Sequence, residues 1–168
     1  VFAIEVEKRR AGALTALAPH LPPNLLRAAL DAAQSIEWAY ARADVMTGLA
    51  SHLPPDLRAI ALQAALEAAY AIQREYARVG ALAGLAPHLP PDLCTTALQA
   101  AVDAARAIQR EYARAKALAS LAPHLPPDLR ANALRAALDA ARAIEWKNIR
   151  AEALANLAPH LPADLLPT

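Results

Sequence analysis

The sequence has few of the residues on which most functional classes depend. It contains one cysteine, four glycines and 4% aromatic residues, which excludes an internal disulfide framework and leaves no glycine-rich phosphate loop. Basic and acidic residues nearly balance, at 17 and 16, so nothing in the charge favours binding of nucleic acid or of an anionic membrane. No run of about 18 apolar residues free of charge and proline occurs, so we expect no membrane span.

The single cysteine, Cys94, is consistent with a reducing compartment, and we therefore expect a cytoplasmic protein. No histidine lies near Cys94 in the sequence, and no other nucleophile stands beside a base. We expect Cys94 to pack as a small apolar side chain. The sequence thus predicts neither an enzyme nor a cofactor.

Alanine and leucine, together with arginine, glutamate and glutamine, make up most of the chain between the prolines, and 57% of all residues are hydrophobic. These residue types favour helices, and β-branched residues are too few for sheets. The composition predicts an all-α fold.

A nine-residue segment, Leu-Ala-Pro-His-Leu-Pro-Pro-Asp-Leu, recurs along the whole chain. It is unchanged at 85–93 and 121–129 and carries one substitution at 17–25, 49–57 and 157–165. Its histidines are separated by 32, 36, 36 and 36 residues, and this spacing is typical of helical repeat proteins. The histidines are His20, His52, His88, His124 and His160.

We interpret residues 1–168 as a single repeat domain made of units of 36 residues. The short unit lacks four residues after Leu25, which is close to one helical turn and keeps its apolar face in phase. The expected units are a half repeat at 1–20, a short repeat at 21–52, full repeats at 53–88, 89–124 and 125–160, and the start of another at 161–168.

Within a full unit we expect two helices. Proline and Asp56 suit the first turn of a helix over 55–70, because proline needs no N–H partner there and a carboxylate faces the positive end of the dipole. A second helix is expected over 75–86, where Pro87 stops it. No glycine or proline separates the two helices. A single straight helix over both segments could not pack its apolar stripe against itself, so we place a turn at 72–74. The matching turns are at 36–38, 108–110 and 144–146.

The unit resembles the helix–turn–helix repeats of α-solenoids such as the HEAT and tetratricopeptide repeats. More narrowly, units of the form Ala-Leu-Ala-x-Leu-Ala-Pro-His-Leu-Pro-Pro resemble helical repeats of bacterial signalling proteins of the STAND type. The resemblance covers essentially the whole chain. It implies a right-handed α-solenoid of stacked antiparallel helical hairpins that binds a protein or peptide without catalysis, as a scaffold or sensor segment of a larger protein.

Neither end of the array has the polar cap that a solenoid needs. We therefore expect a segment of a longer array, whose ends stack head to tail between molecules. A structural spacer or self-assembling segment is the alternative function.

The five histidines do not predict a metal site. Equivalent residues of adjacent units should lie about 8–10 Å apart, whereas zinc needs nitrogens at about 2.1 Å from one ion. We expect structural histidines in turns. The Pro-His-Leu-Pro segments also have the PxxP spacing that aromatic grooves recognise, but their place between helices explains the prolines equally.

An arginine column and an acidic column recur 11 residues apart. We expect an arginine–carboxylate ladder that fixes the register of the helices; the alternative is an arginine stripe that binds an acidic peptide or phosphate. The expected pairs are Asp31 with Arg42, Glu67 with Arg78, Asp103 with Arg114 and Asp139 with Arg150, and Arg10 belongs to the arginine column.

Partner binding is expected where the units differ, around the turn between the two helices. Tyrosine, tryptophan and arginine collect there, and these residues are enriched in binding hot spots. The alternative is that the rings fill gaps between hairpins. The candidate residues are Trp38, Tyr40, Arg74, Tyr76, Arg110, Tyr112, Trp146, Lys147 and Asn148.

Overall fold

The computed structural model describes the backbone of residues 2–161 and the side chains of residues 5–22 and 24–161. Over this part the chain is all-α, as predicted, with no strand. The α-helices are α1 (Phe2–Leu17), α2 (Pro23–Gln34), α3 (Ala39–Ala50), α4 (Pro55–Tyr70), α5 (Glu75–Leu85), α6 (Pro91–Arg106), α7 (Glu111–Leu121), α8 (Pro127–Arg142) and α9 (Lys147–Leu157). Short 3-10 helices follow four of them, at Ala18–His20, Ala86–His88, Ala122–His124 and Ala158–His160.

The predicted helix bounds are confirmed almost to the residue. Helix α4 covers 55–70, and α5 begins at Glu75 and ends at Leu85, one residue before the predicted end. The short helix of the second unit is also confirmed, because α2 has 12 residues and α4 has 16. The start of a further helix, expected at 161–168, lies almost entirely outside the described residues.

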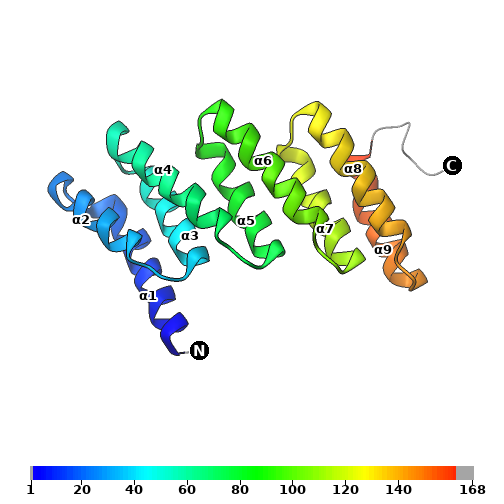
Figure 1. The fold of residues 1–168 in the computed structure, drawn as a ribbon, viewed down its shortest axis with the longest axis horizontal. Coiled ribbons are helices and arrows are strands. Elements are labelled where there is room, and N and C mark those ends of the chain that lie inside the picture. Colours follow the sequence, from blue (N-terminus) through cyan, green and yellow to red (C-terminus); the bar gives the residue numbers. More distant parts are fainter. Residues whose placement is uncertain (1, 162–168) are drawn as a thin grey trace.

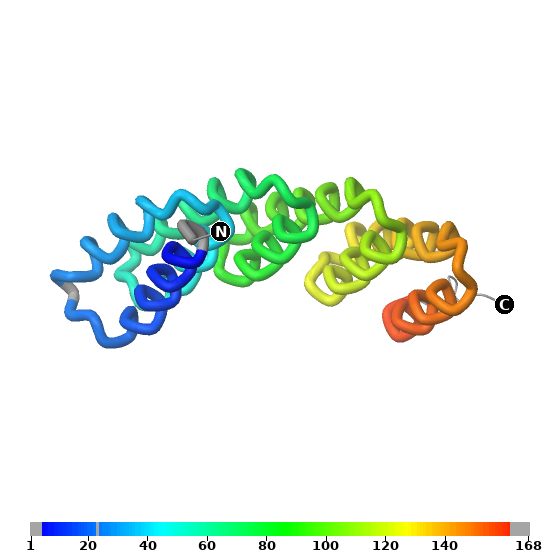
Figure 2. The backbone as a smooth tube through the Cα atoms, turned by 90° about the horizontal axis from the view of Figure 1, so that it is seen from below, coloured from blue at the N-terminus to red at the C-terminus, as the bar shows by residue number. Residues whose placement is uncertain are grey.

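The helices form a row of two layers (Figure 1). The even-numbered helices α2, α4, α6 and α8 make one layer and the odd-numbered helices make the other. The row is arched, and the odd-numbered helices lie on its inner side (Figure 2). We call their exposed surface, which points away from the even-numbered helices, the inner face.

Leucine and alanine hold the two layers together. One leucine column of the odd-numbered helices is at most 1% exposed at Leu49, Leu85, Leu121 and Leu157. On the even-numbered helices, alanines at successive turns are completely buried, for example Ala61, Ala65 and Ala69. Such small side chains let neighbouring helices approach closely. No polar or charged side chain among those described is buried, so the inter-helix packing is apolar.

The proline-rich segments connect each odd-numbered helix to the next even-numbered one. At Ala86–His88 the chain makes a 3-10 turn, Pro90 is the extended N-cap residue, and Pro91 begins α6. In the copy where Ser51 stands in place of the proline equivalent to Pro87, no 3-10 helix forms, and the Ser51 hydroxyl donates to the Gly48 carbonyl at 3.0 Å. Three of the helix pairs joined by these proline segments have the most extensive contacts, α3 with α4, α5 with α6, and α7 with α8, whereas α1 and α2 touch only slightly.

In two of the proline segments, an arginine of the following even-numbered helix donates hydrogen bonds to backbone carbonyls. Arg58 Nε donates to the Ala50 carbonyl at 3.0 Å, and its Nη2 donates to the Leu53 carbonyl at 3.2 Å. Arg130 Nη2 likewise donates to the Leu125 carbonyl at 2.9 Å. Cys94 stands at the equivalent position of α6 and is partly buried, in line with the expected small apolar side chain.

Four-residue turns connect each even-numbered helix to the next odd-numbered one, where the turns were predicted. Residues 71–74 separate α4 from α5 without glycine or proline. In place of these, each turn buries one isoleucine, which fixes the reversal by packing. The isoleucines are Ile36, Ile72, Ile108 and Ile144, exposed by 0%, 6%, 8% and 5%. Over the described helices, none is both long and apolar enough to cross a membrane.

Candidate functional site

The arginine column serves the four-residue turns. Arg114 Nη1 donates to the carbonyl of Ile108 at 2.8 Å and to that of Gln109 at 3.4 Å. Arg42 and Arg150 make the same bond to the isoleucine six residues earlier, at 2.6 and 3.0 Å. These bonds satisfy carbonyls left free where the even-numbered helix ends.

None of the expected arginine–carboxylate pairs is among the ion pairs of the described residues, and three of the four acidic side chains bind within their own helices. Asp31 pairs with Arg27 at 3.4 Å, and Asp103 with Arg106 at 4.0 Å. The side-chain amides of Gln63 and Gln99 donate to Glu67 and Asp103, each at 3.0 Å. These carboxylates lie on the exposed side of the even-numbered helices, where a neighbour three or four residues away is the nearest partner.

Two members of the arginine column depart from the pattern. Arg78 reaches only the Gln73 carbonyl, at 3.5 Å, and its buried Nε has no hydrogen-bond partner. Arg10 Nη2 donates instead to the Ser35 hydroxyl at 2.8 Å. The arginines are thus tied to turns and are not arranged as an open stripe on the inner face.

Trp38 is part of the contact between α1 and α3. Glu7 accepts hydrogen bonds from the backbone N–H groups of Glu37 and Trp38, at 2.9 and 2.7 Å. Lys8 Nζ of α1 lies 5.8 Å from the centroid of the Trp38 ring. The centroids of the Trp38 and Tyr40 rings are 5.5 Å apart. The partly buried indole therefore fills a gap between helices, which was the alternative expected for the rings.

The remaining candidates are mostly open to solvent. Trp146 is 71% exposed and Tyr76 is 59% exposed. Arg74 and Arg110 precede the first turns of α5 and α7 with exposed side chains, and Lys147 and Asn148 begin α9 in the same way. Of the predicted set, Tyr40 and Tyr112 each line one of two grooves between the odd-numbered helices.

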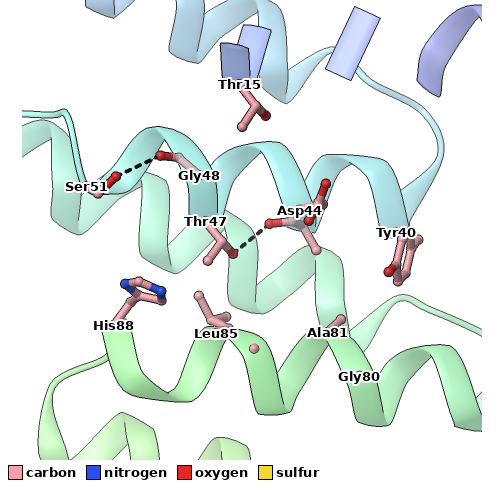
Figure 3. A pocket seen from close by; sticks show the side chains of 12 residues that line it. Thr15, Tyr40, Asp44, Thr47, Gly48, Ser51, Gly80, Ala81, Leu85 and His88 are labelled. Atoms are coloured by element: carbon pink, nitrogen blue, oxygen red, sulfur yellow. Dashed lines mark hydrogen bonds between the residues drawn. The ribbon is translucent and has the colours of Figure 1, made fainter. Parts of the chain in front are cut away.

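The first groove, which we call groove 1, lies between α3 and α5 and has a volume of about 310 Å³. Tyr40, Asp44 and Thr47 of α3 face it on one side, and Gly80 and Gly84 of α5 on the other (Figure 3). A Cβ atom added at either glycine would meet nothing within 4 Å, so the groove is open above the α5 backbone. By contrast, a Cβ at Gly48 would lie 2.9 Å from Thr15, where α1 closes on α3.

The second groove, groove 2, lies between α7 and α9 and has a volume of about 330 Å³. Lys116 and Ser120 line it from α7, Asn156 from α9 and His160 from the 3-10 helix that follows α9. The Tyr112 hydroxyl donates to Glu152 at 2.8 Å across the two helices. This hydrogen bond raises the pKa of Tyr112 above its ordinary value, and desolvation and the nearby carboxylate charge act in the same direction.

The inner face contains variable residues that the sequence-based analysis missed. Each odd-numbered helix from α3 to α9 carries an exposed or partly exposed stripe at i, i+4 and i+8 that begins with the Tyr40 column and ends near the histidine. The i+4 position differs in each of these units, as Asp44, Gly80, Lys116 and Glu152. The i+8 position is glycine in two units and differs in the others, as Gly48, Gly84, Ser120 and Asn156. Their divergence in the alignment of units was the available signal.

All five histidines are exposed, and His88 and His160 lie at corresponding ends of the two grooves. Among the described residues no group of three or more histidine, cysteine, aspartate or glutamate side chains is placed to hold a metal ion.

Comparison with family models, with curated proteins and with solved structures found no match to this chain. Its class is therefore given by the structure alone: an all-α protein of helices packed on their neighbours in a row, compatible with a helical repeat.

Proposed function

We propose that this chain is a HEAT-like α-solenoid that binds a peptide or protein segment along its inner face, without catalysis. The observation that supports this proposal most directly is the difference in burial between a column that repeats and a column that varies among the odd-numbered helices. The leucine column, which repeats along the chain, is buried in α3, α5, α7 and α9, whereas the i+4 position of the inner-face stripe, which differs in each of these helices, is exposed. Packing requires the repeated residues to be alike, so the differing residues are free to recognise a partner.

The two glycines of α5 also support this proposal. Glycine inside a helix costs about 1 kcal/mol relative to alanine, yet Gly80 and Gly84 have open space where a side chain would stand. Packing does not require them, and their effect is to leave groove 1 open. The role of scaffold or sensor within a larger bacterial signalling protein, and a cytoplasmic location, belong to the same proposal and rest on the repeat pattern and the single cysteine.

Filling groove 1 tests the proposal. A phage-displayed random dodecapeptide library would be selected on the immobilised chain, and the recovered peptides measured by fluorescence polarisation. We expect Gly84→Phe to lower peptide affinity at least tenfold. The matched control is Gly12→Phe, since Gly12 also has open space but lines neither groove. Failure to recover any peptide, or equal affinity for both variants, would refute inner-face binding.

Self-association is a second candidate because of one exposed residue on α1. Leu17 is 52% exposed, whereas the leucines at the same place in the other units are at most 1% exposed. In those units the leucine's helix packs against the preceding odd-numbered helix, a contact that α1 lacks within the described chain, so α9 of a second copy is a suitable cover for α1. Sedimentation velocity over a range of concentrations would show association that Leu17→Glu removes. A single monomeric species at high concentration would exclude it.

A further inference from the structure

Building on the proposed function, we propose that the inner face selects an extended peptide by charge. The peptide places a basic side chain in groove 1 and an acidic side chain in groove 2. Three features of the two grooves support this: the sign of the charge in each, the hydrogen-bonding state of their hydroxyl groups, and the distance between them.

Groove 1 presents one formal charge and several acceptors. Asp44 is the only aspartate, glutamate, lysine or arginine among its lining residues, and no ion pair is formed by its exposed carboxylate within the described chain. The hydroxyls of Thr15, Thr47 and Ser51 donate to backbone carbonyls at 3.1, 2.8 and 3.0 Å.

Since each hydroxyl has one hydrogen, the lone pairs of these three oxygens are what remains for a ligand. Figure 3 shows Asp44, Thr47 and Ser51 along the α3 side of the groove, with the Tyr40 ring at one end and His88 at the other. A lysine or arginine side chain supplies donors for these oxygens and a positive charge to match Asp44, and the Tyr40 ring is a suitable face for a cation.

Groove 2 has the opposite charge. Lys116 is its only charged lining residue if His160 is neutral, and over the described residues no carboxylate is paired with its ammonium group. The Ser120 hydroxyl donates to the Ala117 carbonyl at 2.8 Å, and the Tyr112 hydroxyl donates to Glu152. Glu152 is therefore engaged by Tyr112 and does not line the groove. The donors of Lys116 fit an aspartate or glutamate side chain of the peptide.

The spacing of the grooves sets the spacing of the two charges. Groove 1 lies between α3 and α5 and groove 2 between α7 and α9, so their centres are two helix intervals apart. Packed helices lie about 8–10 Å apart, which separates the grooves by about 16–20 Å. An extended chain advances about 3.3 Å per residue, so the basic and acidic residues should be about five or six positions apart.

Charge reversal tests this inference in the same dodecapeptide selection. We expect the peptides recovered on the wild-type chain to be enriched in a basic and an acidic residue five or six positions apart. Asp44→Lys and Lys116→Glu should each weaken binding of a synthetic selected peptide at least tenfold. The doubly substituted chain should prefer the same peptide with its two charges exchanged. Asp139→Lys, an exposed charge reversal on α8, is the matched control.

The outcomes separate this inference from the proposed function. Random placement of charges among the recovered peptides, or unchanged affinity in Asp44→Lys, would overturn the charge selection. If Gly84→Phe still abolished binding in that case, inner-face binding would stand without it. Recovery of no peptide at all would refute both, and circular dichroism of each variant would show whether the helices are retained.

Discussion

The proline segments and the four-residue turns both reverse the chain between antiparallel helices, but they use different groups. At a proline segment the backbone itself ends the helix, because Pro87 and Pro90 cannot continue it, and an arginine is optional: Arg58 and Arg130 are present in two units and Cys94 replaces them in a third. At a four-residue turn no residue breaks the helix. A buried isoleucine and an arginine bonded to turn carbonyls hold it instead.

This difference means that the two turns should respond differently to mutation. A reversal held by side chains loses its stability when one side chain is removed. A reversal held by proline should tolerate side-chain changes and improve when a missing proline or arginine is restored.

The largest effect is expected for Ile108→Ala, which removes the buried side chain of the turn between α6 and α7. Truncation of a buried isoleucine costs about 2–4 kcal/mol. Urea unfolding followed by circular dichroism measures this loss. Ile60→Ala on the surface of α4, where the side chain is 43% exposed, is the control and should cost less than about 1 kcal/mol. Similar losses in the two variants would mean that the turn does not depend on its isoleucine.

Next is Arg114→Met, which keeps the aliphatic stem but loses the bonds to Ile108 and Gln109. Because the site is partly exposed, we expect a loss of about 1.5 kcal/mol, at the lower end for charged hydrogen bonds. Arg78→Met is a control within the same column, since its one bond is 3.5 Å long, and it should cost less than about 0.5 kcal/mol. Unchanged stability in both variants would revive the interpretation of the column as a binding stripe.

These arginines also show the limit of prediction from the sequence. The helices could be placed because proline and aspartate mark their starts and an apolar stripe marks their length. The acceptors of Arg114 could not be predicted in this way. They are backbone carbonyls, which every residue has, so no residue type in the sequence identifies them. An acidic column 11 residues away was visible, but the pairs inferred from it are not among the ion pairs of the described residues.

The grooves show a second limit. The column of Asp44, Gly80, Lys116 and Glu152 could be seen to vary, but recognising it as a surface requires knowing which side of each helix the even-numbered layer covers. The turn aromatics were chosen by residue type instead. One of them, Trp38, is used in packing, and the structure assigns Tyr40 and Tyr112 to the grooves.

A smaller effect, of opposite sign, is expected for Cys94→Arg. Arginine at this position should reach the Leu89 carbonyl, as Arg58 and Arg130 reach the equivalent carbonyls of Leu53 and Leu125. We expect a gain of about 1 kcal/mol in the free energy of unfolding. Cys94→Met supplies similar bulk without donors and serves as the control. A gain equal to that of the methionine variant would show that bulk alone is responsible.

Ser51→Pro should give a gain of about 0.5 kcal/mol, because proline restricts the unfolded chain and the native Ser51 φ of −67° suits its ring. Differential scanning calorimetry would detect the rise in melting temperature. Ser51→Ala removes the hydroxyl without adding a ring, and we expect it to be less stable than the proline variant. The reverse order would mean that the 3-10 geometry of the other copies is not accessible here.

The smallest effect concerns the residue that follows one of the four-residue turns. Tyr112 has a raised pKa. Its hydrogen bond to Glu152 therefore contributes fully to the free energy of unfolding below the ordinary pKa of 10.0, and this contribution is lost as pH rises through the raised pKa. The alkaline absorbance difference between the wild type and Tyr112→Phe isolates this ionisation. In Glu152→Gln it should move to lower pH, and an unmoved transition would contradict the assigned cause.

The arginine bonds to turn carbonyls also bear on how such a chain grows or shrinks during evolution. Arg114 and its acceptor at Ile108 are six residues apart and lie in one stretch of the gene, so any duplication of that stretch copies donor and acceptor together. An ion pair between units would instead require each new neighbour to supply a matching partner. A turn that carries its own hydrogen-bond partner lets units be duplicated or deleted without compensating mutations, and leaves the exposed positions of each copy free to diverge.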